Sequence, residues 1–278
     1  MIVDFHTHIF SSDLIKQRNR YIDDKNYSFL YSDEKAKLID HNIMLRAMDD
    51  SGIDHVVIMG FPWENEKYCQ EQNQYFKDVF VLSKGRIIPF ASVPLSINTN
   101  IEEWVKGIKD LGLFGIGEIA FYSDGMNKTN SAILRKIFES AQIYSLPVCL
   151  HLNEPVGHDY PGKYEPDLNV IYSILKDFPE LTVVLAHWGG GILFYEMMPE
   201  VREAFRNVYY DIAASPFLYS NDIYDVAIKI LGSEKILFGS DYPLIRFERY
   251  LTDIEKNVKD EKHRKNIIGE NARRILKL

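Results

Sequence analysis

Short aliphatic runs alternate along this chain with longer stretches in which apolar residues recur at helical spacing. Each short run has the length of a β-strand, and each longer stretch can cross back over a sheet as a helix. The predicted strands, eight in all, cover residues 2–8, 55–62, 87–94, 114–121, 147–153, 182–189, 208–215 and 236–243. Amphipathic stretches that predict crossover helices include residues 101–111, 131–144, 168–178 and 222–231.

This alternation predicts a parallel sheet, and eight such units are enough to close a (β/α)8 TIM barrel. The competing architecture is an open, doubly wound sheet, which normally carries a glycine-rich phosphate turn after its first strand. Here that position holds His6-Thr7-His8, so we favour the closed barrel. No Pro-, Gly- or Ser-rich linker divides the chain, which predicts one domain over residues 1–278. Residues 10–40 form an insertion after the first strand that we expect to cover the barrel mouth as a lid.

Two histidines end the first predicted strand. His6 and His8 are two positions apart, so the period of a strand places both imidazoles on one side, facing the barrel mouth. Two such nitrogens can chelate one metal ion, but strand-end histidines bonded to backbone groups are an equally ordinary arrangement. The pair alone therefore leaves both interpretations open.

Four further polar residues lie near the carboxyl ends of other predicted strands: Glu118, His151, His187 and Asp241. Barrel enzymes collect their catalytic groups at that face, whereas structural polar residues need not favour it. Imidazole and carboxylate groups together bind zinc or a similar divalent ion and leave a position open for water. Such an ion lowers the pKa of bound water from about 15.7 to about 7, so the pattern predicts metal-assisted hydrolysis.

Each of these residues also has a structural interpretation. Glu118 could accept hydrogen bonds behind the ligands or be protonated, and Asp241 could cap the turn that follows it. His187 could be an ordinary buried histidine. Asp4 and Asp211 could orient an imidazole or make structural hydrogen bonds, and we leave both outside the predicted site.

The composition fits a globular enzyme and restricts the kinds of partner that the protein could bind. Of the 278 residues, 46% are apolar and 26% are charged. This apolar fraction is enough to form a large hydrophobic core. The formal net charge of -8 opposes general attraction to nucleic acid or to an anionic membrane. Cys69 and Cys149 lie far apart, so we expect no disulfide framework, and a cytoplasmic location fits. The sequence also leads us to expect no secretion signal and no membrane-spanning segment.

Six short segments carry a resemblance that spans nearly the whole chain. They are Asp4-Phe5-His6-Thr7-His8, Gly117-Glu118-Ile119, Cys149-Leu150-His151-Leu152, Ala186-His187-Trp188-Gly189-Gly190, Phe238-Gly239-Ser240-Asp241-Tyr242-Pro243 and Gly269-Glu270-Asn271-Ala272. Together they resemble the metal-dependent amidohydrolase superfamily, and in particular its amidohydrolase-2 branch. That branch includes enzymes similar to aminocarboxymuconate-semialdehyde decarboxylase.

The resemblance implies a ligand set and a catalytic residue. A single metal ion would be held by His6, His8, His151 and Asp241. His187 would act on the substrate as an acid, a base or an electrophile. In superfamily members with two ions, a glutamate or a carboxylated lysine at the end of the fourth strand bridges them, and Glu118 occupies that place. One or two ions are therefore expected.

The leading hypothesis from the sequence is hydrolysis of a C–N or C–O bond, in an amide, lactam, lactone or ester, with Asp241 and His187 assisting proton transfer. Zinc is the expected ion, with manganese or iron as alternatives. The first alternative function is metal-dependent, non-oxidative decarboxylation of an unsaturated or aromatic acid, and the second is a barrel that binds metal without catalysis. We expect a small-molecule substrate, no nucleic-acid or membrane partner, and a homodimer, the commonest symmetric assembly.

Overall fold

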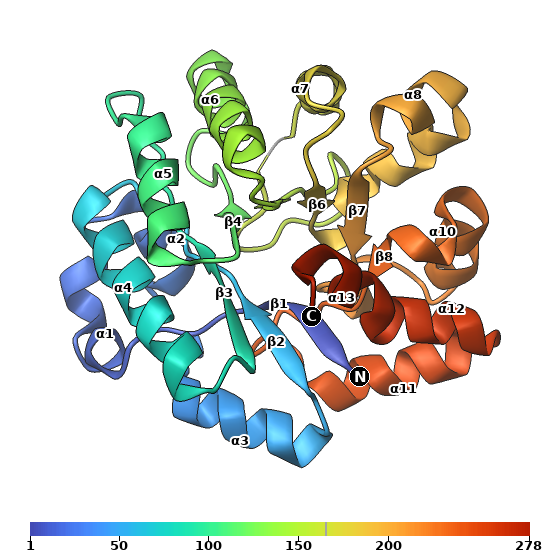
Figure 1. Ribbon diagram of the computed structural model, residues 1–278, viewed down its shortest axis with the longest axis horizontal. Coiled ribbons are helices and arrows are strands. Elements are labelled where there is room, and N and C mark those ends of the chain that lie inside the picture. Colours follow the sequence, from blue (N-terminus) through green and yellow to red (C-terminus); the bar gives the residue numbers. More distant parts are fainter. Residues whose placement is uncertain (165) are drawn as a thin grey trace.

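Eight parallel strands form a barrel in the computed structural model, which describes residues 1–164 and 166–278 (Figure 1). The strands pair in sequence order, and every neighbouring pair is parallel. The backbone N–H of Phe5 donates to the carbonyl of Phe238 at 2.7 Å, which brings the last strand against the first. The predicted (β/α)8 TIM barrel is confirmed. Its strands are β1 (Val3–Thr7), β2 (His55–Ile58), β3 (Ile87–Ala91), β4 (Gly115–Ile119), β5 (Val148–Leu150), β6 (Val183–Leu185), β7 (Val208–Asp211) and β8 (Ile236–Leu237).

Helices surround the strands in a ring (Figure 1). The α-helices are α1 (Ser12–Lys16), α2 (Lys25–Tyr31), α3 (His41–Ser51), α4 (Glu66–Leu82), α5 (Ile101–Leu111), α6 (Lys128–Tyr144), α7 (Leu168–Asp177), α8 (Pro199–Ala204), α9 (Ser215–Leu218), α10 (Ile223–Leu231), α11 (Phe247–Asn257), α12 (Glu261–Lys265) and α13 (Asn271–Leu276). Short 3-10 segments are η1 (Arg18–Tyr21) and η3 (Ser233–Lys235), and η4 (Asn266–Glu270) is a π-helical turn. The longer η2 (His187–Met197) is interrupted by non-helical backbone at residues 188–191. None of the helices in the described residues is long and apolar enough to cross a membrane.

Every predicted strand is present, but the observed strands end earlier than predicted. The largest difference is at β8, whose ladder covers Ile236–Leu237, whereas the predicted strand extends to residue 243. Phe238 stays fully buried after the ladder has ended, and the backbone then turns at Asp241. His8, His151, His187 and Asp241 therefore lie beyond the ends of their strands. His6 and Glu118 lie within β1 and β4.

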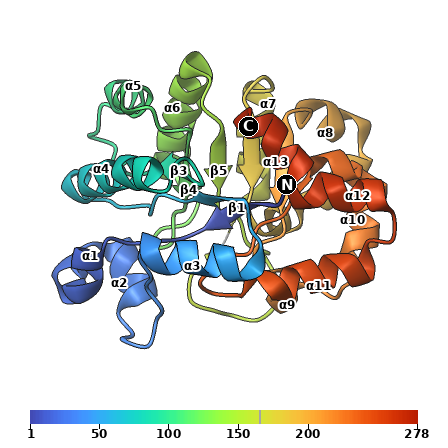
Figure 2. The same ribbon diagram turned by 60° about the horizontal axis from the view of Figure 1, so that its bottom comes forward.

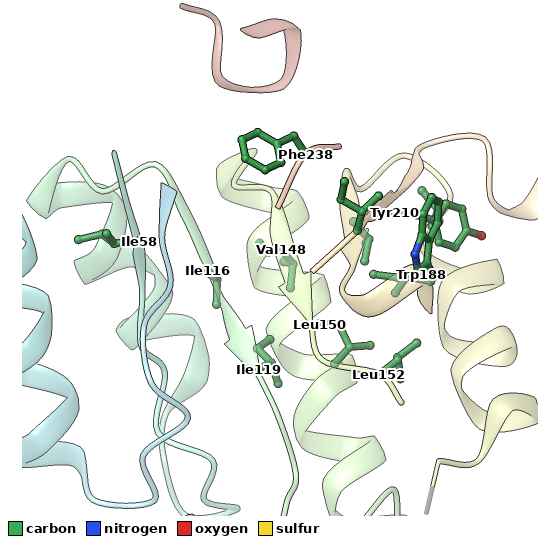
Figure 3. Packing of buried hydrophobic residues seen from close by; sticks show 14 of the residues in the cluster. Ile58, Ile116, Ile119, Val148, Leu150, Leu152, Trp188, Tyr210 and Phe238 are labelled. Carbon is green, nitrogen blue, oxygen red and sulfur yellow. The ribbon is translucent and has the colours of Figure 1, made fainter. Parts of the chain in front are cut away.

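Alternate strand residues pack into two apolar layers. Val56 and Ile58 belong to the large cluster that includes helix residues, so this face of each strand packs against the surrounding helices. Figure 3 shows part of that layer, with Val148 and Leu150 of β5. Val57 lies in the other cluster, which strand residues and the C-terminal helix α13 form and which fills the barrel interior. Both termini lie close together at the amino ends of the strands (Figure 1).

Residues 10–40 fold into α1, η1 and α2 and are anchored to the loop after β2. One carboxylate oxygen of Asp24 accepts hydrogen bonds from the backbone N–H groups of Glu64 and Asn65. The side-chain amide of Asn26 donates to the carbonyl of Pro62 at 2.7 Å. Figure 2 shows α1 and α2 on the same side of the barrel as α9. The insertion thus forms a wall beside the mouth, and its movement as a lid stays a prediction.

A glycine after β2 offers a test of how tightly the barrel is packed. A Cβ atom at Gly60 would overlap the backbone nitrogen of Ser92. Gly60→Ala is therefore expected to lower the free energy of unfolding by about 1–3 kcal/mol. At Gly107 in α5 an added Cβ meets nothing within 4 Å, so Gly107→Ala should raise stability by about 0.5–1 kcal/mol. Urea unfolding measures both, and equal stabilities of the two variants would contradict the prediction.

Candidate active site

A cavity of about 620 Å³ opens at the carboxyl ends of the strands. Its floor includes five of the six residues predicted from the sequence, namely His8, Glu118, His151, His187 and Asp241, and the sixth, His6, is fully buried against them. The walls come from the end of α2, from Tyr122 after β4, and from residues within the segments 35–37, 61–62, 158–162, 214–218 and 243–244. Strand ends thus supply the polar floor, and loops supply walls that are mainly apolar and aromatic.

His6, His8 and Asp241 form one cluster of potential metal ligands, with their ligand atoms all within 4.8 Å of one another. The Nε2 atoms of His6 and His8 are 3.1 Å apart. Asp241 Oδ1 lies 3.0 Å from Nε2 of His8 and 4.0 Å from Nε2 of His6. Ligands bound at about 2.0–2.1 Å around a tetrahedral ion lie about 3.3 Å from one another. These spacings therefore fit ligands that share one cation.

A second cluster, of His6, Glu118 and His187, shares His6 with the first. Glu118 Oε2 is 3.7 Å from His6 Nε2, and Glu118 Oε1 is 3.4 Å from His187 Nε2. The Nδ1 atom of His187 lies 3.1 Å from the carbonyl oxygen of Ala213, which can only accept. His187 Nε2 can consequently face the Glu118 carboxylate only with a proton on it or with a cation between them.

His151 lies beside the second cluster and not within the first. Its Nδ1 atom is 2.9 Å from Glu118 Oε1 and 3.1 Å from His187 Nε2. Its Nε2 atom is buried and has no hydrogen-bond partner in the part of the chain that the structure describes. An imidazole nitrogen in this state is costly unless it binds a further group. His151 therefore offers a free ligand atom at the cavity floor.

Asp211, at the end of β7, is the residue that the sequence analysis left outside the site. Its Oδ2 accepts from Nδ1 of His6 at 2.8 Å, and its Oδ1 accepts from the backbone N–H of His187 at 2.9 Å. The first bond fixes the tautomer of His6 that directs Nε2 toward the other ligands. The available signal was its position at the end of the seventh strand. Asp4, in contrast, accepts hydrogen bonds from the backbone N–H groups of His6 and Ser240.

Burial and the surrounding carboxylates act on the histidines in opposite directions. Burial alone would lower the pKa of His6, but the charges of Asp211 and Glu118 outweigh it and raise that pKa to about 10. Burial would also lower the pKa of His187, but its hydrogen bond with Glu118 raises it to about 9. Burial would raise the pKa of Glu118, yet the nearby His151 and His6 hold it well below its usual range.

This lowered pKa favours the ionised form of Glu118 over the protonated carboxyl, the other form considered from the sequence. The carboxylates at the floor require positive charge close to them, which protons on the histidines or a divalent cation can supply. Together with the converging donor atoms and the free nitrogen of His151, this charge balance fits a divalent metal ion. His6, His8 and Asp241 would hold such an ion, and His151 or Glu118 could complete its ligands.

Two floor residues hold a backbone conformation that sequence patterns do not reveal. His187 has a φ of 57° and Asp241 a φ of 59°, in the left-handed region that costs a side-chain-bearing residue about 1–2 kcal/mol. Hydrogen bonds compensate: the N–H of Asp241 donates to the carbonyl of His6 at 2.8 Å, and that of His187 donates to Asp211. The backbone thus aims both side chains into one site.

Replacing Asp211 tests its role behind His6. In Asp211→Asn an amide NH2 replaces the oxygen that accepts from His6 Nδ1. Two N–H donors then face each other, so the bond that orients His6 is lost. We expect the Kd for manganese, measured by competition with a chelating dye, to rise about 10–100-fold. The matched control is Asp253→Asn, a largely buried carboxyl on α11 that pairs with Arg249. Equal metal affinity in the two variants would show that Asp211 has only a structural role.

Comparison with known proteins places the chain in a family. The sequence profile described as amidohydrolase, of the amidohydrolase-2 type, matches residues 3–278, and the chain belongs to this family. No curated protein matches it.

Solved structures share the fold at low sequence identity. The 5-carboxyvanillate decarboxylase of Sphingomonas paucimobilis is 17% identical with a TM-score of 0.77, over 100% of this chain and 99% of that one. A dihydroxybenzoic acid decarboxylase from a Polaromonas species, solved with bound manganese and the inhibitor 2-nitroresorcinol, is 17% identical with a TM-score of 0.72, over 100% and 97%. A probable 2-pyrone-4,6-dicarboxylic acid hydrolase from Acinetobacter baumannii, solved with citric acid, is 16% identical with a TM-score of 0.66, over 100% and 99%.

Proposed function

We propose that the protein is a divalent-metal-dependent decarboxylase that acts on a small unsaturated or aromatic acid. The observation that carries this proposal is the cavity itself, in which a floor of imidazoles and carboxylates lies beneath aromatic walls. Two of the structural neighbours are named decarboxylases, which favours this reaction over hydrolysis, the leading hypothesis from the sequence. Manganese in one of them likewise makes manganese a better first choice than zinc.

The residues of the chain would divide the reaction between binding and proton transfer. When bound, the ion supplies positive charge that holds the substrate carboxylate. Phe61, Tyr122 and Phe217 line the cavity and would hold a flat ring between them. Loss of CO2 leaves an electron pair on the substrate carbon, which must then take up a proton. Asp241, which lies beside His8, and His187, which lies beside Glu118, would hold and deliver that proton.

Hydrolysis is the second candidate, because one observation favours it. The second ligand cluster shares His6 with the first and adds a carboxylate, Glu118, that the first cluster does not contain. A second acceptor near the cavity could assist an attacking water molecule. One structural neighbour with the same fold is named as a probable 2-pyrone-4,6-dicarboxylic acid hydrolase.

Isotope labelling separates the two reactions. Manganese-loaded protein without an affinity tag would be incubated with aromatic acids that carry a carbon-13 carboxyl group, and in parallel with lactones, esters and amides in oxygen-18 water. Labelled CO2 from an acid, absent when the metal is removed by a chelator, supports decarboxylation. Oxygen-18 in a cleaved product without labelled CO2 from any acid would overturn the proposal in favour of hydrolysis.

A further inference from the structure

Two tyrosines at the cavity have hydroxyl groups without a partner. Tyr31 ends α2 and Tyr122 follows β4, and both line the cavity. Within residues 1–164 and 166–278 no protein group forms a hydrogen bond with either hydroxyl. Neither oxygen is among the buried, unpaired polar atoms, so both are open to the cavity. A phenol in this position is a donor available to a ligand.

The two side chains come from different walls and are held by different neighbours. The ring of Tyr31 packs against Phe10 and Phe61, with centroids 5.3 and 5.7 Å away. The ring of Tyr122 lies edge-on to His151 at 5.2 Å and stacks with Phe29 at 6.3 Å. Neither ring can therefore swing freely, and each hydroxyl has a defined position at the cavity.

Both tyrosines line the same cavity as the carboxylates Glu118 and Asp241. Burial raises the pKa of Tyr31 and that of Tyr122, and the charges of Glu118 and Asp241 add to both increases. Tyr31 itself contributes to the increase at Tyr122. An ordinary phenol is already neutral at pH 7, so both groups are O–H donors beside the floor.

Arg18 fixes the backbone that carries Tyr31. Its guanidinium donates to four carbonyl groups of one turn, at 2.9 Å to Tyr31, Asp33 and Glu34 and at 3.3 Å to Ala36. The accepting carbonyls run from Tyr31, the last residue of α2, to Ala36, which itself lines the cavity. The turn is thus folded around a cation before any ligand arrives, which limits the entropy lost on binding.

We propose that Tyr31 and Tyr122 together bind a second oxygen group of the substrate, a phenolic or carboxylate oxygen beside the carboxylate held at the floor. Two preorganised O–H donors are the arrangement that stabilises negative charge on oxygen in enzyme sites. This assignment rests on the proposed function, since it names a feature of the acid that the site takes. Lys35 and Lys37, which line the outer part of the cavity, add positive charge along the path of such a ligand.

Calorimetric titration of the manganese-loaded protein tests the assignment without relying on turnover. Three probes are used. The first, 2,6-dihydroxybenzoate, carries phenolic oxygens and is a ligand of one structural neighbour. Isophthalate carries a second carboxylate, and benzoate carries neither group. Tyr31→Phe and Tyr122→Phe should each raise the Kd of at least one of the first two probes about tenfold and leave that of benzoate unchanged. The probe that loses affinity identifies the kind of oxygen bound. The matched control is Tyr21→Phe, whose hydroxyl faces Glu71 away from the cavity.

A double-mutant cycle tests Arg18 as a positioning residue. Arg18→Ala should raise the Kd of the same probe, but should add little in the Tyr31→Phe background, because its effect passes through that hydroxyl. If Arg18 had only a structural role, Arg18→Ala would raise the Kd by the same factor in the wild-type and Tyr31→Phe backgrounds.

The outcomes separate this assignment from the proposed reaction. Unchanged Kd values for both probes in both tyrosine variants, with metal content intact, would overturn it even if CO2 is released. Failure of both 2,6-dihydroxybenzoate and isophthalate to bind the wild-type protein would also overturn it. Tyrosine-dependent binding without CO2 release from any acid would overturn the reaction and leave the oxygen-binding pair in place.

Discussion

Asp241→Asn is expected to lower kcat by about 10²–10⁴-fold on the substrate that the isotope assay identifies. The amide keeps the size of the carboxyl group and one oxygen, so the cavity should retain its shape. It cannot hold or deliver a proton at catalytic pH, and it loses the charge that lies 3.0 Å from Nε2 of His8. Steady-state kinetics should therefore show the loss mainly in kcat.

The control for this prediction is the same substitution at an exposed site. Asp110→Asn on α5 removes a carboxylate that pairs with Lys106 in solvent, and it should leave kcat unchanged. Metal content is measured in both variants, so that loss of the ion is not mistaken for loss of the proton-transferring group. An Asp241→Asn variant with full metal content and wild-type kcat would remove Asp241 from the mechanism.

The double variant His6→Ala, His8→Ala is expected to lose its bound metal. The two Nε2 atoms converge at 3.1 Å, and alanine removes both from the cluster that they form with Asp241. Elemental mass spectrometry on protein purified without an affinity tag or added metal should find one or two equivalents in the wild type. In the variant the metal content should fall by at least about tenfold, since removing a direct ligand weakens metal binding more than removing a group that only orients a ligand.

Two histidines elsewhere provide the matched control for metal binding. His55 lies at the start of β2, at the opposite end of the strand from the cavity, and His263 lies on α12. His55→Ala, His263→Ala removes the same number of imidazoles and should keep the wild-type metal content. A wild-type protein that is free of metal and cannot be reloaded would contradict the metal site altogether.

The barrel could be predicted from the sequence because each of its eight units carries its own pattern. The helix predicted over residues 101–111 is α5, because an apolar stripe follows Asn100, whose side chain caps the first turn, and Gly112 ends the helix in a left-handed conformation. The ends of the strands could not be predicted in the same way. Hydrophobicity reports burial, and Phe238 is buried although it lies outside the ladder of β8. Hydrogen bonding between strands leaves no such mark on the sequence.

The candidate site could be predicted as a set of residues but not as a geometry. His6 and His8 stand out together with the other polar residues at strand ends, because strand spacing puts both imidazoles on one side of the strand. The role of Asp211 depends on a contact with His6 across 205 positions, which no local pattern encodes. The orientation of His151 depends in the same way on Glu118, which lies 33 positions earlier. Which nitrogen of a histidine is free is decided by such distant partners.

The division of the cavity into a floor of strand ends and walls of loops has an evolutionary consequence. The wall formed by residues 10–40 is folded around its own Arg18 and fixed to the barrel by a few bonds from Asp24 and Asn26. A loop of this kind can change in length or sequence while the strands and their metal ligands stay as they are. Descendants of one ancestral barrel could therefore acquire new substrates by altering this single segment, and inherit the chemistry of the floor unchanged.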